Sequence, residues 1–237
     1  MAPNPEATKQ RLVRAAEELF AQRGIECVSL REINAAAGQR NATALQYHFH
    51  DRYGLLLAVL GKHHPDVEAR RHELLDRYEA AGVDDLRELA KALVLPYAAK
   101  LADPDGGRFY LRVYAQVLNM PDPTFDRSLP ADPSDSHDSI TRWRGLVGPL
   151  LPEIGVRRFH HRFTAMRVTA VELARRAAGT PRDDQLFTSH LVDLVTAVLA
   201  TPISEETAML LAERDAQERA AHPAAGRARR RVPAVAR

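Results

Sequence analysis

Apolar residues recur every three or four positions along most of this chain, which is the spacing of one face of an α-helix. Glycines, prolines and short polar runs interrupt this pattern and mark the ends of helices. The pattern predicts helices at 8–23, 52–63, 65–81, 84–102, 107–119, 134–151, 156–179, 182–200 and 204–220. Pro96 falls inside one of them and is expected to kink or split it. Because no segment keeps the two-residue alternation of a β-strand, the sequence predicts an all-α protein.

Two shorter helices with a tight break between them are expected in residues 29–49. Ser29 can cap the first helix, because its hydroxyl can accept a backbone N–H of the first turn. Gly38 stands where a helix can end in a left-handed residue, and Asn41 can cap the second helix after the turn. Two short helices joined in this way are typical of a helix-turn-helix, whose second helix enters a DNA groove while the first braces it.

The second of these helices has two faces of different character. Leu45, His48 and Phe49 share one face. The opposite face consists of small or hydrogen-bonding residues, namely Ala42, Thr43, Gln46, Tyr47 and His50. Solubility alone does not require such a face, whereas a recognition helix must fit closely and offer donors and acceptors to base edges. This face therefore indicates DNA recognition.

A longer set of residues surrounds this motif: Ala15, Ala16, Leu19, Phe20, Gly24, Ser29, Leu30, Ile33, Ala37, Gly38, Leu45, His48, Phe49 and Leu55. In this order and nearly this spacing they resemble the DNA-binding domain of TetR-type bacterial transcriptional regulators, over residues 8–60. The stretch from Gly38 to Phe49 is one residue longer than the common pattern, so the usual aromatic of the recognition helix falls at Gln46, beside Tyr47. The family's usual lysine shortly after the phenylalanine is Arg52 here.

The resemblance implies a three-helix helix-turn-helix domain followed by a larger helical domain that binds a ligand and dimerises. Contacts to the DNA backbone, which fix register, are expected from Ser29, Arg40, Tyr47 and Arg52. Contacts to base edges are expected from Asn41, Thr43 and Gln46. Whether Gln46 or Tyr47 contacts phosphate stays open. We expect a ligand-responsive regulator, most often a repressor in this family, that binds a palindromic operator of double-stranded DNA as a homodimer.

Length and composition indicate domain bounds and limit the size of any DNA-binding surface. The 237 residues suffice for two modest domains, expected at 1–53 and 54–221. Residues 222–237 hold five arginines and no acidic residue, and are expected to form a solvated, disordered tail. The formal net charge of the chain is only +2, so a DNA-binding surface must be local rather than a general basic coat.

The sequence indicates neither catalysis nor a cofactor. It contains no Gly-rich phosphate loop, no HExxH and no nucleophile elbow, so we expect no enzyme and no bound metal. No stretch approaches the ~20 apolar residues that span a bilayer, and the first residues lack an apolar signal core. A cytoplasmic protein without membrane contact is therefore expected. The alternative is a helical enzyme or a small-molecule or lipid carrier, whose first helices are only structural.

The helices expected at 156–179 and 182–200 carry apolar residues on more than one side. One side can pack on the chain's own domain and the other on the same two helices of a second subunit, as in a four-helix bundle across a two-fold axis. The interface is expected to include Phe159, Phe163, Met166, Ala170, Leu173, Phe187, Leu191, Leu194 and Val198. Packing within a single chain is the alternative.

The helix expected at 107–119 has a mixed second face that could line a ligand pocket. Its residues Phe109, Arg112 and Gln116, together with Trp143, would supply apolar walls and a few orienting polar groups. Such a pocket favours a small hydrophobic or amphipathic effector. Simple solvation of this face is the alternative.

Overall fold

A computed structural model describes residues 5–39, 44–120, 138–151, 160–180 and 182–221 of the chain. Every regular element in these ranges is helical, which confirms the all-α fold class. The chain divides into two compact units, Met1–Ala200 and Thr201–Arg237. The first unit contains all helices from α1 to α10, whereas α11 (Glu205–Ala221) belongs to the second.

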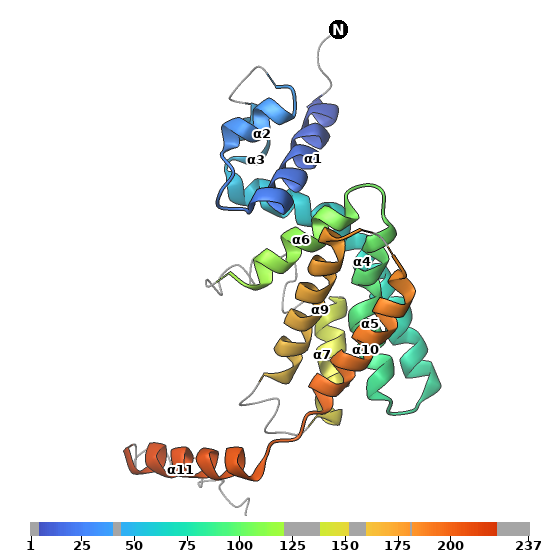
Figure 1. Ribbon diagram of the computed structural model, residues 1–237, viewed down its shortest axis with the longest axis vertical. Helices are drawn as coiled ribbons and strands as arrows, with labels where there is room; N and C mark the ends of the chain where they lie inside the picture. Colours follow the sequence, from blue (N-terminus) through green and yellow to red (C-terminus); the bar gives the residue numbers. More distant parts are fainter. Residues whose placement is uncertain (1–4, 40–43, 121–137, 152–159, 181, 222–237) are drawn as a thin grey trace, which may run out of the picture. The chain divides into compact units, whose positions relative to one another are not determined.

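Three helices precede the first long helix: α1 (Pro5–Arg23), α2 (Leu30–Ala36) and α3 (Ala44–Phe49) (Figure 1). They pack around one small apolar core with the start of α4, formed by Leu12, Ala16, Phe20, Ile33, Leu45, Phe49 and Leu55. Each helix supplies residues from one side only, as the three- and four-residue spacing predicts. Gly24 ends α1 with a positive φ of 97°, a conformation that glycine adopts at little cost.

The helix α4 (Arg52–Ala81) is a single helix of 30 residues. The predicted break at His64-Pro65 is therefore wrong, because Pro65 lies inside the helix. Buried residues on both sides of the proline, His63 and Val67, keep one face of α4 packed, so tertiary contacts hold the helix together where the proline removes a backbone hydrogen bond. As a result, α4 runs without interruption from the helix-turn-helix into the rest of the unit.

The next elements are α5 (Leu86–Ala98), the short 3-10 helix η1 (Ala99–Ala102) and α6 (Gly107–Leu118). The expected helix at 84–102 is thus divided shortly after Pro96, as its proline predicts. Then follow α7 (Ser139–Val147), the 3-10 helix η2 (Gly148–Leu150), α9 (His161–Ala178) and α10 (Asp184–Ala200).

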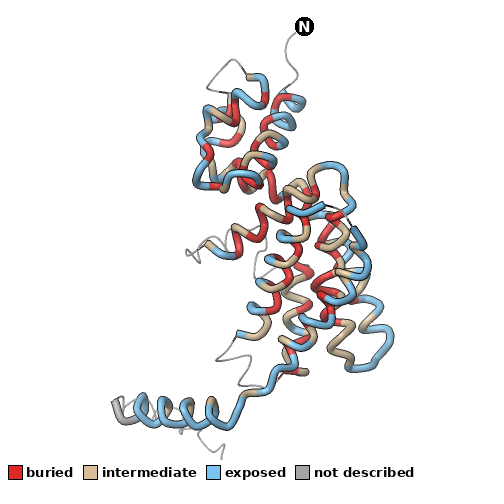
Figure 2. The backbone as a smooth tube through the Cα atoms, in the orientation of Figure 1, coloured by how far each residue is buried: buried red, intermediate tan, exposed pale blue. Residues whose placement is uncertain are grey.

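These later helices form a bundle in which α5 packs between α4 and α10, and α6 packs along α9. Buried positions follow the inner sides of the helices (Figure 2). Trp143 of α7 is fully buried, and its indole Nε1 donates to the carbonyl oxygen of Leu89 in α5 at 2.7 Å. None of the described helices is by itself long and apolar enough to cross a membrane. Only the lengths and compositions of α10 and α11, counted together, would meet that requirement.

Candidate nucleic-acid interface

The start of α2 is fixed by a reciprocal capping box. The Ser29 hydroxyl accepts from the Glu32 amide at 3.3 Å, and Glu32 Oε2 accepts from the Ser29 amide at 2.8 Å and from its hydroxyl at 2.7 Å. Arg23, the last residue of α1, donates to Glu32 Oε1 at 2.7 Å. Hydrogen bonds from Ser29 and Arg23 lower the pKa of Glu32 to about 2. Together these contacts bind α2 to the end of α1.

The turn after α2 is made by Gly38, whose φ is 67°. A Cβ here would meet nothing within 4 Å, so the backbone conformation rather than space favours glycine. The next predicted DNA contacts, Arg40, Asn41 and Thr43, lie outside the described residues. Their roles remain predictions.

The helix α3 has the two faces expected from its sequence. Leu45 and Phe49 are buried, while Gln46 is exposed and Tyr47 is 81% exposed. A tyrosine so exposed is unusual on a surface without a partner, since its ring then loses the free energy gained by burial. The buried pair thus holds α3 in place and leaves Gln46 and Tyr47 free to contact another molecule.

The backbone that connects α3 to α4 is tightly constrained. Asp51 caps α4 by accepting from the Gly54 amide at 2.8 Å. A Cβ on Gly54 would lie 2.2 Å from the Phe49 carbonyl oxygen, so this close approach requires glycine. The orientation of α3 relative to α4 is therefore determined by backbone contacts.

Arg52 has a role that the sequence does not reveal. Its guanidinium donates to the Val28 carbonyl oxygen at 3.0 Å and pairs with Glu26 at 3.1 Å, so it joins the start of α4 to the loop before α2. The side chain is 35% exposed. It can contact a phosphate only with the part of the guanidinium that these two groups leave open.

Two of the four predicted pocket residues, Gln116 and Trp143, form hydrogen bonds to other helices. Gln116 accepts from the Ile25 amide and donates to the Phe20 carbonyl oxygen, both at 3.0 Å, and so joins α6 to the end of α1. Trp143 is bonded to α5, whereas Phe109 and Arg112 are half-buried on α6. The predicted pocket residues are therefore not brought together by shared contacts.

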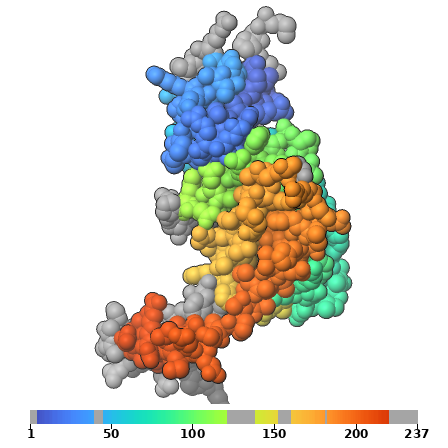
Figure 3. Space-filling model, in the orientation of Figure 1, coloured from blue at the N-terminus to red at the C-terminus, as the bar shows by residue number. Residues whose placement is uncertain are grey.

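The predicted dimer residues divide into two groups. Met166, Ala170, Leu173 and Leu191 are buried among the chain's own helices. Phe163 and Leu194 are about 40% exposed, Phe187 and Val198 are half-buried, and Phe159 lies outside the described residues. Val171 and Leu186, absent from the predicted set, are also exposed. The helices α9 and α10 lie side by side on one face (Figure 3).

A short helix with exposed Gln46 and Tyr47, braced by a capped helix and three-helix core, defines a helix-turn-helix DNA-binding protein. Residues 12–59 match the family model described as bacterial regulatory proteins, tetR family. The resemblance inferred from the sequence is therefore confirmed for the helix-turn-helix region, residues 12–59.

Solved structures of similar fold include NalD, the secondary repressor of the MexAB-OprM multidrug efflux pump in Pseudomonas aeruginosa. It is 19% identical, with a TM-score of 0.45, over 84% of this chain and all of that chain. A gamma-butyrolactone receptor (ArpA-like protein) is 20% identical, with a TM-score of 0.43, over 81% of this chain and 98% of the other. No curated protein matches the chain. The likeness to the tetR family is thus carried by residues 12–59.

Proposed function

We propose that this protein is a ligand-responsive repressor that binds a palindromic operator as a homodimer. The observation that carries the proposal is the exposed face of α3, where Gln46 and Tyr47 extend from a helix anchored by Leu45 and Phe49. A helix with this division can enter the major groove and present polar groups to base edges. Tyr47 and Arg52 then contact the DNA backbone and fix the register, with Ser29 at the start of α2.

The predicted contacts at Arg40, Asn41 and Thr43 complete this interface in the proposal. Because a dimer presents two recognition helices related by a two-fold axis, the operator is an inverted repeat, with half-sites a whole number of turns apart. The proposed domain bounds are 1–53 for DNA binding, 54–221 for ligand binding and dimerisation, and 222–237 for a basic tail. Such a regulator acts in the cytoplasm, where its operator is accessible.

The second subunit packs on the outward side of α9 and α10. Phe163 and Val171 are exposed on α9, and Leu186 and Leu194 on α10, so a partner that covers them buries four large apolar side chains. Two such helix pairs form a four-helix bundle.

The dimer is tested by light scattering, which should give twice the mass of the chain at micromolar concentration. Leu194→Glu places a charge in the proposed interface and should give a monomer, whereas Val83→Glu, at an exposed apolar residue outside α9 and α10, should not. A wild-type monomer at micromolar concentration would exclude the proposed dimer.

Effector binding changes DNA affinity through α4, which begins at Arg52 beside the helix-turn-helix and continues to Ala81. An effector releases DNA only if it binds the conformation with unproductive spacing of the two recognition helices more tightly. The uninterrupted helix favours this route, since a movement at one end of α4 is transmitted to the other.

The function is tested by a gel shift with DNA from upstream of the protein's own gene. We expect a complex that survives excess non-specific competitor and weakens steeply as salt rises. Absence of a complex at low salt, or one that any competitor DNA abolishes, would argue for the carrier alternative.

A further inference from the structure

The most buried arginine among the described residues lies inside the helical bundle. Arg71 of α4 is 1% exposed and lies against α5, α6 and α7. A buried guanidinium is costly unless its charge is balanced and its N–H groups are hydrogen-bonded. The hydrogen bonds that each guanidinium nitrogen makes therefore indicate whether an anion could bind beside Arg71.

One nitrogen of Arg71 is well satisfied. Its Nη1 donates to Glu68 Oε1 at 3.0 Å and to the Ser139 hydroxyl at 2.7 Å. Ser139 in turn donates its amide to Glu68 Oε2 at 2.8 Å. These three residues hold the guanidinium in a fixed orientation between α4 and the start of α7.

The other two nitrogens are less well satisfied. Nε and Nη2 of Arg71 are buried, and neither makes a hydrogen bond of good geometry among the described residues, although a side-chain interaction with the Tyr97 hydroxyl helps to raise the pKa of Arg71. Nε and Nη2 form one edge of the planar guanidinium, with two parallel N–H groups. This is the edge that binds a carboxylate or a phosphate through two parallel hydrogen bonds.

Aromatic rings surround this group. The Tyr97 ring centroid lies 5.2 Å from Arg71 Cζ and stacks on Tyr114 at 4.7 Å, which is followed by Tyr110 at 5.9 Å. The Tyr97 hydroxyl donates to that of Tyr114 at 2.7 Å. Burial raises the pKa of Tyr110 and of Tyr114 well above the ordinary value, so both phenols stay neutral and supply no anion to balance the guanidinium.

Arg71 itself stays charged. Burial alone would lower its pKa, but Tyr97 and Glu68 outweigh this effect and the pKa is raised. A permanent cation with one bidentate edge thus lies beside a buried stack of tyrosine rings, a combination suited to an anion attached to an aromatic or apolar body.

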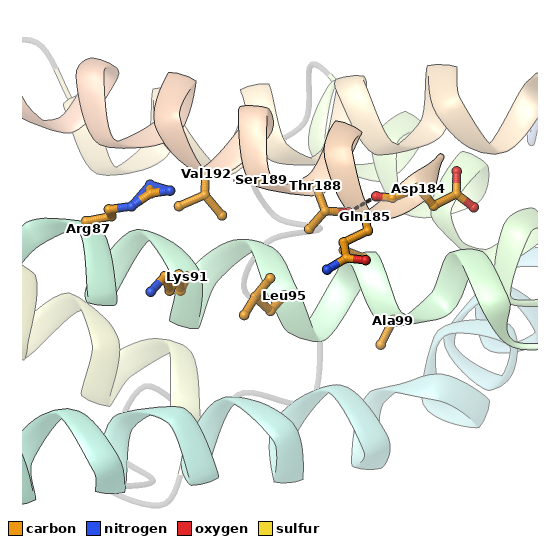
Figure 4. A pocket seen from close by; sticks show the side chains of 10 residues that line it. Arg87, Lys91, Leu95, Ala99, Asp184, Gln185, Thr188, Ser189 and Val192 are labelled. Carbon is orange, nitrogen blue, oxygen red and sulfur yellow. Dashed lines mark hydrogen bonds between the residues drawn. The ribbon is translucent and has the colours of Figure 1, made fainter. Parts of the chain in front are cut away.

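A second candidate, the groove between α5 and α10, has a different character. It encloses about 420 Å³, and Figure 4 shows Arg87 and Lys91 of α5 along it, opposite Thr188 and Val192 of α10. Both cations already have carboxylate partners: Arg87 pairs with Asp193 at 2.6 Å and Lys91 with Glu88 at 2.5 Å. The groove therefore offers no open cationic edge.

We propose that Nε and Nη2 of Arg71 bind the carboxylate or phosphate of an amphipathic effector, whose aromatic or apolar part packs against Tyr97, Tyr110 and Tyr114. This site rests on the proposed ligand response and names its effector class. It differs from the pocket expected at Phe109, Arg112, Gln116 and Trp143, because the orienting charge comes from α4.

The full-length protein is titrated with three probes of similar size: phenylacetate, phenyl phosphate and the neutral 2-phenylethanol. Binding is followed by calorimetry and by the fluorescence of Trp143, the single tryptophan, which lies one helical turn after Ser139. We expect at least one anion to bind about tenfold or more tightly than the alcohol. The preferred anion tells whether the effector carries a carboxylate or a phosphate.

Arg71→Met keeps an unbranched apolar stem but removes the guanidinium, and should remove the preference for the anion, whereas Arg71→Lys should retain only part of it. Arg87→Met, in the groove of Figure 4, is the matched control and should bind the anion as the wild type does. If Arg71→Met does not fold by circular dichroism, the wild-type preference for anion over alcohol and its loss in Ser139→Ala decide the question.

No binding of either anion at millimolar concentration, equal affinity for anion and alcohol, or loss of binding in Arg87→Met instead of Arg71→Met would overturn the site. A gel shift on the same samples separates this result from the proposed function. Arg71→Met should still bind DNA, while a wild type that binds the anion but no DNA would refute only the DNA-binding role.

Discussion

At the scale of single residues, Glu32 shows how surrounding hydrogen bonds stabilise a charged carboxylate. Its carboxylate accepts from the Ser29 amide and hydroxyl and from Arg23, which lowers its pKa from an ordinary 4.5 to about 2. Because the folded pKa lies below the unfolded one, Glu32 stabilises the fold fully above pH 4.5 and loses this contribution as the pH falls towards 2.

Glu32→Gln should therefore be less stable than the wild type at neutral pH, and the difference should shrink between pH 4.5 and 2, as measured by thermal unfolding at a series of pH values. Glutamine keeps the capping geometry but lacks the charge. Ser29→Ala, which removes the cap itself, should cost about 1 kcal/mol at neutral pH. A difference between wild type and Glu32→Gln that does not depend on pH would contradict the role of the carboxylate.

In the proposed function, base recognition depends most directly on Gln46. Gln46→Ala should weaken binding to the operator by ~1–3 kcal/mol and relax the preference at one base pair, because glutamine can pair with two atoms of adenine. The measurement is a set of gel shifts with operators mutated one base pair at a time. Gln22→Ala, an equally exposed glutamine on α1, is the control and should leave both affinity and preference intact. Unchanged base preference in Gln46→Ala would remove its assigned role.

The sequence predicts the exposure of some of these residues but not the long-range contacts of others. The exposure of Gln46 and Tyr47 follows from helical spacing alone, since both faces of a helix are set by local periodicity. The contacts of Arg52 and Gln116 do not, because their backbone partners lie 24 and 91 positions away along the chain. The open edge of Arg71 does not follow from the sequence for the same reason, because only the packed bundle brings α5, α6 and α7 against this residue of α4.

At the scale of elements, α4 shows where local patterns fail. Where the expected ends fall in the described residues, the sequence predicts the other helix ends to within a few residues, because glycines, prolines and capping residues act locally. Pro65 looks like such an end, yet α4 continues through it, since His63 and Val67 are buried on either side. The contribution of these contacts cannot be read from the sequence around the proline.

Pro65→Ala should therefore stabilise the protein by roughly 1–2 kcal/mol, because it restores a backbone donor inside a helix that already exists. The gain is reduced by the greater freedom of the unfolded chain. Thermal and urea unfolding measure the effect. Pro149→Ala is the control, since Pro149 lies in the first turn of η2, where proline is tolerated, and should not stabilise. A loss of stability in Pro65→Ala would mean that α4 requires the proline at this position.

At the scale of the whole first unit, one continuous set of contacts joins the proposed effector site to α1. We call the rings of Tyr97, Tyr114, Tyr110 and His63 the ring stack; His63 lies 4.6 Å from Tyr110, centroid to centroid. His63 Nε2 lies 2.5 Å from Oε1 of Glu17, a buried residue of α1. Lys62 donates to the other oxygen of Glu17 at 2.8 Å.

Glu17 is thus the point at which the ring stack meets α1. Glu17→Gln keeps the shape of the side chain but removes the charge that holds His63 and Lys62. In the wild type we expect a saturating anionic probe to change DNA affinity by about tenfold, a typical coupling between two sites. In Glu17→Gln this factor should fall towards one, while the affinity for the probe alone changes little.

The measurement is a thermodynamic cycle: DNA affinity with and without probe, and probe affinity with and without DNA, which must give the same factor. Glu18→Gln is the matched control, because it makes the same substitution one residue along α1 on the exposed side, where the carboxylate only meets Gln22. It should leave the factor unchanged. If Glu17→Gln lowers the melting temperature but leaves the coupling factor intact, the buried pair only stabilises the fold, and the effector must act on α1 by another route.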